Sequence, residues 1–182
     1  MAIKRLAPME LTQTHSQRKY NLGSRYCSPA TSTEGEKEYM YIQYDDGTAN
    51  ITANTHQLLV PHTGDLTKYT GDKTNLTKVT NGRFAGVLMG NCSTTSNKYA
   101  WIQIKGETWL RACGTTCAAG DALYAGPGGT DLGADIVRNT TNFTAAWTAT
   151  TTLYKTIASG FGVAIAAAAE TTSQLTINLN GF

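Results

Sequence analysis

The segment FAGVLM at residues 84–89 leads through a small, polar stretch into YAWIQIKG at residues 99–106. The same order recurs later, where FGVAIA at residues 161–166 is followed by LTINLNG at residues 175–181. Each copy predicts a β-hairpin, because its second arm has the period-2 alternation of a strand half buried on one face; the apolar positions are Trp101, Ile102, Ile104, Leu175, Ile177 and Leu179. The duplication predicts one sheet or barrel built from two related halves. Since the repeated unit contains no catalytic group, it favours a scaffold over an enzyme.

The composition favours strands along the whole chain. Its 182 residues are enough for one domain with a buried core, and only 15% of them are charged, against roughly 25% in soluble globular domains. Thr and Gly are plentiful, and the β-branched Thr side chain suits a pleated surface. We therefore predict an all-β fold, a compact β-barrel-like or β-sandwich-like domain with duplicated hairpins and an extended N-terminal arm.

The charge and the apolar pattern limit the expected partners. The formal net charge of +2 is too small to favour nucleic acid, and the sequence has no apolar run of about 18 residues that would span a membrane. The first residues lack the apolar core of a secretory signal, so we expect assembly in a host cytoplasm. Free thiols are then expected at Cys27, Cys92, Cys113 and Cys117, with two disulfides as the alternative.

Residues 1–38 differ from the rest of the chain. Their apolar residues follow no sustained period. Residues 1–26 contain five cations and one acidic residue, Glu10; the cations are Lys4, Arg5, Arg18, Lys19 and Arg25. We predict an extended arm at residues 1–38 that packs no core of its own and orders against a partner. A β-rich body follows at residues 39–182.

Turn signals divide the body into short strands. The aromatic run at residues 38–44 stops at Asp46-Gly47, which predicts a hairpin with a returning strand at residues 49–52. Residues 61–82 are loop-rich, with short strands near Leu76–Val79. A further strand is expected at residues 108–113 after a turn at Gly106, and another at residues 122–124; residues 139–156 are expected to form a long excursion between the repeats.

No motif indicates a cofactor or a catalytic centre. Cys113 and Cys117 could supply two zinc ligands, but the remaining candidates, Cys27, Cys92, His15, His56 and His62, include no second closely spaced pair. The Asp residues leave paired-carboxylate hydrolysis open, and Asp131 with Asp135 leaves loop calcium binding open, although most of the Asp residues lie beside Gly, where Asp serves turns. We expect neither a cofactor nor a bound metal.

Aromatic residues give a second candidate surface. A sugar-stacking platform or a subunit contact is one interpretation, and core filling is the alternative for about half of the residues. The candidates are Tyr39, Tyr41, Tyr44, Trp101 and Trp109.

The order of these motifs resembles the capsid decoration (cement) proteins of tailed bacteriophages. The resemblance covers roughly residues 82–182 and consists of the first hairpin, the Ala-Gly-Asp-Ala-Leu-Tyr turn at residues 119–124 and the second Gly-Val-Ala hairpin; residues 39–81 and 134–156 depart from it. It implies a compact β-barrel-like body, often trimeric, on the outside of an expanded capsid. It also implies an extended N-terminal arm that reaches across neighbouring capsid subunits.

We therefore expect a non-enzymatic capsid decoration protein on the exterior of the virion. The expected partners are the major capsid protein and further copies of the chain in a homotrimer, without nucleic acid or membrane. The expected capsid-binding residues of the arm are Ile3, Lys4, Arg5, Leu6, Met9, Leu11, Arg18, Lys19, Tyr20, Leu22 and Arg25. The alternative is a carbohydrate-binding or receptor-binding β-module of a virion tail or surface, and an enzyme is the third possibility.

Overall fold

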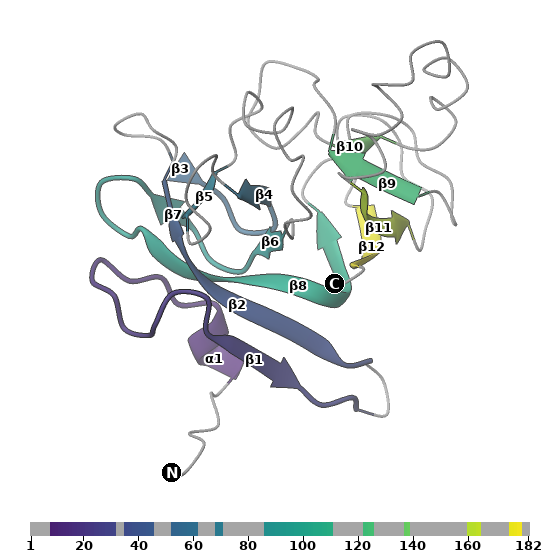
Figure 1. The fold of residues 1–182 in the computed structure, drawn as a ribbon, viewed down its shortest axis with the longest axis horizontal. Coiled ribbons are helices and arrows are strands. Elements are labelled where there is room, and N and C mark those ends of the chain that lie inside the picture. Colours follow the sequence, from purple (N-terminus) through teal and green to yellow (C-terminus); the bar gives the residue numbers. More distant parts are fainter. Residues whose placement is uncertain are drawn as a thin grey trace.

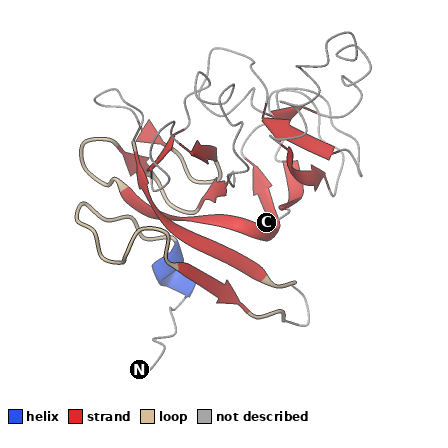
Figure 2. Cartoon of the chain, in the orientation of Figure 1, coloured by secondary structure: helices blue, strands red, loops and turns tan. Residues whose placement is uncertain are grey.

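The computed structural model describes residues 8–31, 35–45, 52–61, 68–70, 86–110, 122–125, 137–138, 160–164 and 175–179. Within these ranges strands dominate and the helix α1 has four residues (Figure 2). The prediction of an all-β fold is confirmed. In chain order the elements are α1 (Pro8–Leu11), β1 (Arg25–Ser28), β2 (Lys37–Tyr44), β3 (Thr52–Ala53), β4 (Leu58–Pro61), β5 (Lys68–Thr70), β6 (Gly86–Leu88), β7 (Cys92–Ser93), β8 (Tyr99–Leu110), β9 (Ala122–Ala125), β10 (Val137–Arg138), β11 (Gly160–Ala164) and β12 (Leu175–Leu179).

Ten strands form one sheet in the order β1-β2-β5-β4-β6-β8-β12-β11-β9-β10, and β3 pairs with β7 in a separate sheet (Figure 1). Because β2 also pairs with β8, the pairings among β2, β5, β4, β6 and β8 return to their start, and the sheet curls around one face. Among the described pairs, β2 with β5 is parallel and the others are antiparallel. The ten-stranded sheet as a whole is not a closed barrel. Its pairings close among β2, β5, β4, β6 and β8, but its order still begins at β1 and ends at β10.

Both repeated segments form the predicted hairpins. β6 pairs antiparallel with β8, and β11 pairs antiparallel with β12. The second arms also pair with each other, since β8 runs antiparallel to β12 from Leu110 opposite Leu175 to Gly106 opposite Leu179. The two copies are therefore joined into one sheet through their second arms. That the two hairpins superpose stays a prediction.

β2 and β8 direct alternate side chains to two faces of the sheet, as the period of a strand requires. On the curled face they meet residues of the short strands around them in the inner cluster: Met40, Ile42, Tyr44, Ala53, Leu59, Tyr69, Leu88, Cys92, Ala100, Ile102 and Ile104. On the opposite face Tyr39, Tyr41 and Trp101 belong to the outer cluster, together with Leu11. Residues 100–104 of β8 are thus buried on both faces, and the expectation of a strand half buried on one face is wrong there.

The N-terminal segment covers the outer cluster. Leu11 is buried against it, and Tyr20, Leu22 and Tyr26 are partly buried in it. β1 extends this cover by pairing with the first half of β2. The described part of the arm therefore packs on the body, which differs from the expectation that it orders against a partner: apolar side chains without a helical or strand period still find a hydrophobic face that lies within reach. The boundary expected at residue 38 falls inside β2.

Gly106 marks the place where β8 changes partners. β8 pairs with β2 up to Lys105 and with β12 from Gly106 onward, and Gly106 has a φ of +90°. The buried side-chain amide of Gln103 supports this kink, because its Nε2 donates hydrogen bonds to the backbone oxygens of Lys105 (3.1 Å) and Glu107 (2.9 Å). The turn expected at Gly106 is wrong, since the strand continues through the glycine.

Other local predictions have mixed outcomes. The strand expected at residues 122–124 is confirmed as β9. Of the strand expected to return onto residues 38–44, the described part belongs to β3, which pairs with β7 instead of β2, so this hairpin is wrong where it can be followed. Residues 76–79 and 139–156 lie outside the described residues.

Candidate partner-binding surface

The expected capsid-binding residues separate into three groups in the structure. Ile3, Lys4, Arg5 and Leu6 lie outside the described residues, and Met9 lies in α1. Leu11, Tyr20 and Leu22 contribute to the outer cluster. The described cations are all exposed: Arg25 pairs with Glu38 across β1 and β2 at 2.7 Å, and Arg18 and Lys19 lie on a loop. Arg18 and Lys19 are thus the members of this set that lie on an exposed loop, at residues 14–19, which we call the polar loop.

The polar loop is fixed at both ends to β2 and β8. At its start, the backbone of His15 exchanges hydrogen bonds with Tyr99, at 2.8 Å for His15 N and 3.1 Å for Tyr99 N. At its end, the backbone N–H of Lys19 donates to Tyr41 Oη at 3.4 Å. Two strands of the sheet therefore hold the loop in place.

Tyr41 and His15 connect the two ends beneath the loop. Tyr41 Oη lies 3.1 Å from His15 Nδ1. The same oxygen accepts the Lys19 N–H, and whether it donates to Nδ1 or accepts from it depends on the tautomer of the His15 ring. Burial, and next the charge of Lys19, lower the pKa of His15 below its ordinary value of 6.5, so the ring is neutral at neutral pH. Burial raises the pKa of Tyr41 above 10.0.

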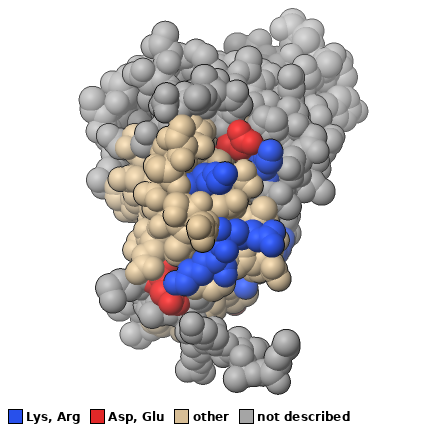
Figure 3. All heavy atoms as spheres, turned by 90° about the vertical axis from the view of Figure 1, so that its left-hand side faces the viewer, with Lys and Arg blue, Asp and Glu red and all other residues tan. Residues whose placement is uncertain are grey.

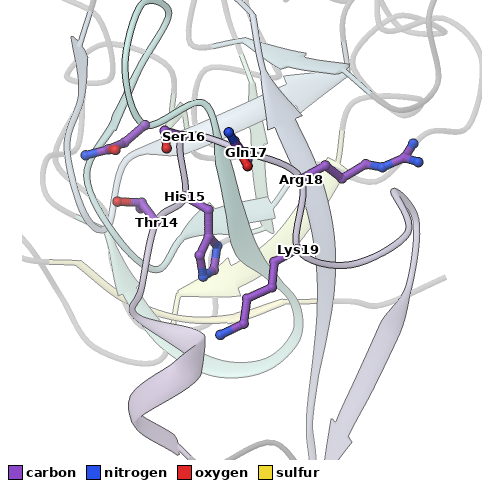
Figure 4. A pocket seen from close by; sticks show the side chains of 7 residues that line it. Thr14, His15, Ser16, Gln17, Arg18 and Lys19 are labelled. Carbon is purple, nitrogen blue, oxygen red and sulfur yellow. The ribbon is translucent and has the colours of Figure 1, made fainter.

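The polar loop borders an open hollow with a volume of about 440 Å³. Asn97, which precedes β8, completes the lining, and Figure 4 shows Arg18 and Lys19 extending from the loop in different directions. Ser16, Gln17 and Arg18 are exposed and form no hydrogen bond or ion pair within the part of the chain that the structure describes. The lining residues are Thr14, His15, Ser16, Gln17, Arg18, Lys19 and Asn97.

The electrostatic character of this side of the molecule is basic. Figure 3 shows Lys and Arg side chains gathered on the face that looks left in Figure 1, with fewer acidic groups among them. Lys19 Nζ lies 4.0 Å from Glu10 Oε1, a separation at which an exposed pair contributes little. Lys98 lies beside Asn97 in the sequence and places its ammonium 5.8 Å from the centre of the Tyr99 ring. The hollow therefore has a positive surrounding.

The aromatic residues do not form the expected sugar-stacking platform. Tyr39, Tyr41, Tyr44 and Trp101 are all buried, and they belong to the two clusters. Trp109 is partly buried and stacks on His56, with ring centres 3.5 Å apart and an interplanar angle of 20°. A platform needs exposed ring faces, so the core-filling alternative applies to these residues.

The outer cluster contains polar atoms as well as rings. Within the described residues, His15 Nε2, Tyr20 Oη and Trp101 Nε1 are buried without a hydrogen-bond partner. The rings around them contact one another at centroid distances of 5.4 Å for Tyr20 with Trp101 and 5.2 Å for Tyr41 with Trp101. This layer thus holds polar atoms whose hydrogen bonds are not made among the described residues.

The cysteines and the acidic groups form no metal site in the described ranges. Cys27 is a free, exposed thiol on β1, and Cys92 is free and buried in the inner cluster, where desolvation raises its pKa to about 12. The free-thiol prediction holds for these two and stays a prediction for Cys113 and Cys117, which lie outside the described residues. Among the described residues no group of three His, Cys, Asp or Glu could hold a metal ion, and no helix is long and apolar enough to cross a membrane.

Sequence reasoning found Arg18 and Lys19 but missed the hollow that they border. Asn97 is separated from the polar loop by almost the whole first half of the chain, and the pairing of His15 with Tyr99 brings the two together. The uninterrupted polar run at residues 14–19 was the signal for an exposed loop. This run carried no information about Asn97, which lies on the other side of the hollow.

The sequence matches no family model and no curated protein. Among solved structures, the chain is similar to the crystal structure of the head fiber gp8.5 N base of bacteriophage phi29. The match has 12% sequence identity and a TM-score of 0.40, and it covers 78% of this chain and 92% of that chain. At these values the similarity assigns neither a fold nor a function to the present chain.

Proposed function

We propose that this chain is a non-enzymatic structural protein of a virion that binds the outer surface of the capsid lattice and stabilises it. The order of motifs in residues 82–182 resembles capsid decoration proteins and supports this assignment. The hairpins β6–β8 and β11–β12 agree with the β-rich body that the resemblance implies.

The observation that carries the proposal is the polar loop. Its two ends are fixed by β2 and β8, while Ser16, Gln17 and Arg18 form no bond within the described residues. A loop held in one conformation loses less entropy on binding than a free arm does, since ordering a residue costs about 1–2 kcal/mol. This favours a partner that docks onto the N-terminal segment as it is already folded.

Capsid protein is the partner that this proposal names, and the loop replaces the extended arm as its main contact. The proposal keeps Ile3, Lys4, Arg5, Leu6 and Met9, which precede the loop in the sequence, as further capsid-binding residues. The chain would be made in the host cytoplasm and act on the capsid exterior. It would act there as a trimer, because its low charge fraction leaves neutral surfaces that suit subunit contacts.

The test is co-sedimentation of the purified chain with empty expanded capsids of its own virus, beside unexpanded shells and a glycan array. We expect saturable binding to expanded capsids, weaker binding to unexpanded shells and none to glycans. Glycan binding without capsid binding would reverse the assignment in favour of the receptor-binding alternative. Hydrolysis of a glycan on the array would indicate the enzyme.

A further inference from the structure

The side chains that line the hollow are hydrogen-bond donors or carry both donor and acceptor atoms. Arg18 and Lys19 are cationic, Thr14 and Ser16 carry hydroxyls, and Gln17 and Asn97 carry amides. The lining contains no carboxylate. The seventh residue, His15, is neutral at neutral pH because burial lowers its pKa, so the positive charge comes from Arg18 and Lys19.

We propose that this hollow binds the carboxylate of an acidic side chain on the surface of a partner protein. The inference deepens the proposed function and rests on it in taking the partner to be a protein. Arg18 presents a guanidinium fork that suits a carboxylate, and it has no ion pair among the described residues, so binding breaks no internal contact there. Lys19 and the hydroxyls of Thr14 and Ser16 supply further donors.

The fixed ends of the polar loop hold the backbone that carries the donors, whereas the side chains of Arg18 and Lys19 extend in different directions (Figure 4). The backbone bonds of His15 with Tyr99 and of Lys19 with Tyr41 Oη hold the loop on two strands, so the backbone between them needs little reordering on binding. Asn97 is held by the loop that precedes β8, where its carbonyl accepts the N–H of Ser93 at 3.1 Å. The backbone on both sides of the hollow is therefore held by hydrogen bonds to strands, from Asn97 to Ser93 in β7 and from His15 to Tyr99 in β8.

The size and charge of the hollow favour a protein carboxylate over a nucleic acid. A volume of about 440 Å³ accommodates a side chain with its flanking backbone, and is larger than a lone ion requires. Two cations would neutralise only about two phosphates, which gives a nucleic acid little affinity at physiological salt. A single acidic residue on a folded surface needs no more charge than Arg18 and Lys19 provide.

The experiment follows the backbone amide signals of the labelled full chain by NMR during titration at low ionic strength. The probes are an oligoglutamate peptide, an oligoglutamine peptide, inorganic phosphate and oligothymidylate. We expect oligoglutamate to shift the amides of Ser16, Gln17, Arg18 and Asn97 in a saturable way, and oligoglutamine to leave them unchanged. No shift with oligoglutamate, or tighter binding of phosphate or oligothymidylate, would overturn the inference.

Matched charge variants separate the hollow from general attraction. The double variant Arg18→Gln/Lys19→Gln should weaken oligoglutamate binding about tenfold or more, as charge-assisted hydrogen bonds imply. The control Lys68→Gln/Lys105→Gln removes the same charge from residues that pair with Asp45 and Glu36 and do not line the hollow, and should leave binding within about twofold. Equal losses in both variants would mean that net charge, and not the hollow, binds the peptide.

Capsid co-sedimentation distinguishes this inference from the proposed function. If wild type decorates capsids and Arg18→Gln/Lys19→Gln decorates them equally well, the carboxylate site is wrong and the decoration function stands. If wild type binds oligoglutamate at the hollow but no capsid, the decoration function is wrong and the carboxylate site stands. Thermal melting of each variant provides the check that these exposed substitutions leave the fold intact.

Discussion

The inner and outer clusters are built from the same two strands but differ in what closes them. β2 sends Met40 and Ile42 to the inner cluster and Tyr39 and Tyr41 to the outer one. The inner cluster is closed by neighbouring strands of the curled sheet, whereas the outer cluster is closed by Leu11 and the rest of the N-terminal segment. Alternation therefore decides which face a side chain takes, and a distant segment decides whether that face is buried.

The two clusters also differ in chemistry. The inner cluster is mainly aliphatic, whereas the outer cluster brings Tyr20, Tyr41 and Trp101, with their polar atoms, into edge-on and tilted contacts. The rings fill the space between a sheet and an irregular segment, where the flat faces of large side chains tolerate varied geometry. A cover made from irregular backbone can thus pack tightly enough to bury Tyr41 completely, with an exposed fraction of 0%.

Deleting residues 1–28 should have the largest effect on stability, because it removes the segment that covers the outer cluster. The sequence predicts that the body folds without its arm, but the structure predicts loss of folding, because the deletion exposes Tyr39, Tyr41 and Trp101. Each fully buried apolar side chain contributes about 1.5–3 kcal/mol, so the loss approaches the 5–15 kcal/mol that stabilises a typical domain. Urea unfolding followed by circular dichroism measures it, with deletion of residues 1–7 as the control. An unchanged midpoint for the longer deletion would show that the outer cluster is dispensable.

Thiol modification compares a buried position with an exposed one. In variants that each keep one cysteine, Cys27 should react at the rate of a free thiol. Cys92 should react at least about a thousandfold more slowly, because the inner cluster must open first. The raised pKa of Cys92, about 12, further keeps the reactive thiolate scarce. Reaction of Cys92 with a disulfide reagent in native buffer measures the rate; a fast reaction would mean that the inner cluster opens readily. Under denaturing conditions the wild-type chain should titrate four thiols.

Substituting Gly106 tests the point where β8 changes its partner from β2 to β12, just after the residues that are buried on both faces. Gly106→Ala should cost about 2–4 kcal/mol, because the φ of +90° is strained for alanine and its Cβ would lie 2.5 Å from the backbone oxygen of Glu36. Gly35→Ala is the matched control, since its Cβ would meet nothing within 4 Å, and its stability should change by less than about 0.5 kcal/mol. Equal effects of the two substitutions in urea unfolding would contradict the kink.

Two tyrosines of the outer cluster should respond in opposite ways to loss of the hydroxyl. Tyr41→Phe should destabilise by about 1–2 kcal/mol, because it removes the acceptor for Lys19 N–H and the partner of His15 Nδ1. Tyr20→Phe should be neutral or slightly stabilising, because Tyr20 Oη is buried without a partner among the described residues. Thermal melting of the pair gives the comparison, and a larger loss for Tyr20→Phe would mean that its hydroxyl is satisfied.

The smallest expected effect is a loss of stability in mild acid. Burial lowers the pKa of both His15 and His56 below the 6.5 of the unfolded chain, so on acidification the unfolded state takes up protons first. Their contribution is complete above pH 6.5 and is lost progressively below it, down to the folded-state values. Urea midpoints at a series of pH values measure the slope, which should be shallower in His15→Gln/His56→Gln than in wild type. An equal slope would assign the effect to carboxyl groups.

The sequence by itself determined the local elements with strong patterns. The alternation and the duplicated apolar segments were sufficient to predict the hairpins β6–β8 and β11–β12, because a β-strand repeats every two residues whatever surrounds it. Low charge and abundant Thr were sufficient for the all-β class.

Only the tertiary structure decided which surfaces are covered and which residues meet. Tyr41 and Trp101 lie on the face opposite the inner cluster, and the N-terminal segment that buries them has no period from which its path could be predicted. The pairing of His15 with Tyr99 brings Asn97 to the polar loop and creates the hollow, and the pairing of β8 with β12 makes Gly106 a kink and not a turn. Local pattern fixes the direction of a side chain relative to its own backbone, but long-range contacts form from the free energy of the whole packed chain, which no short segment contains.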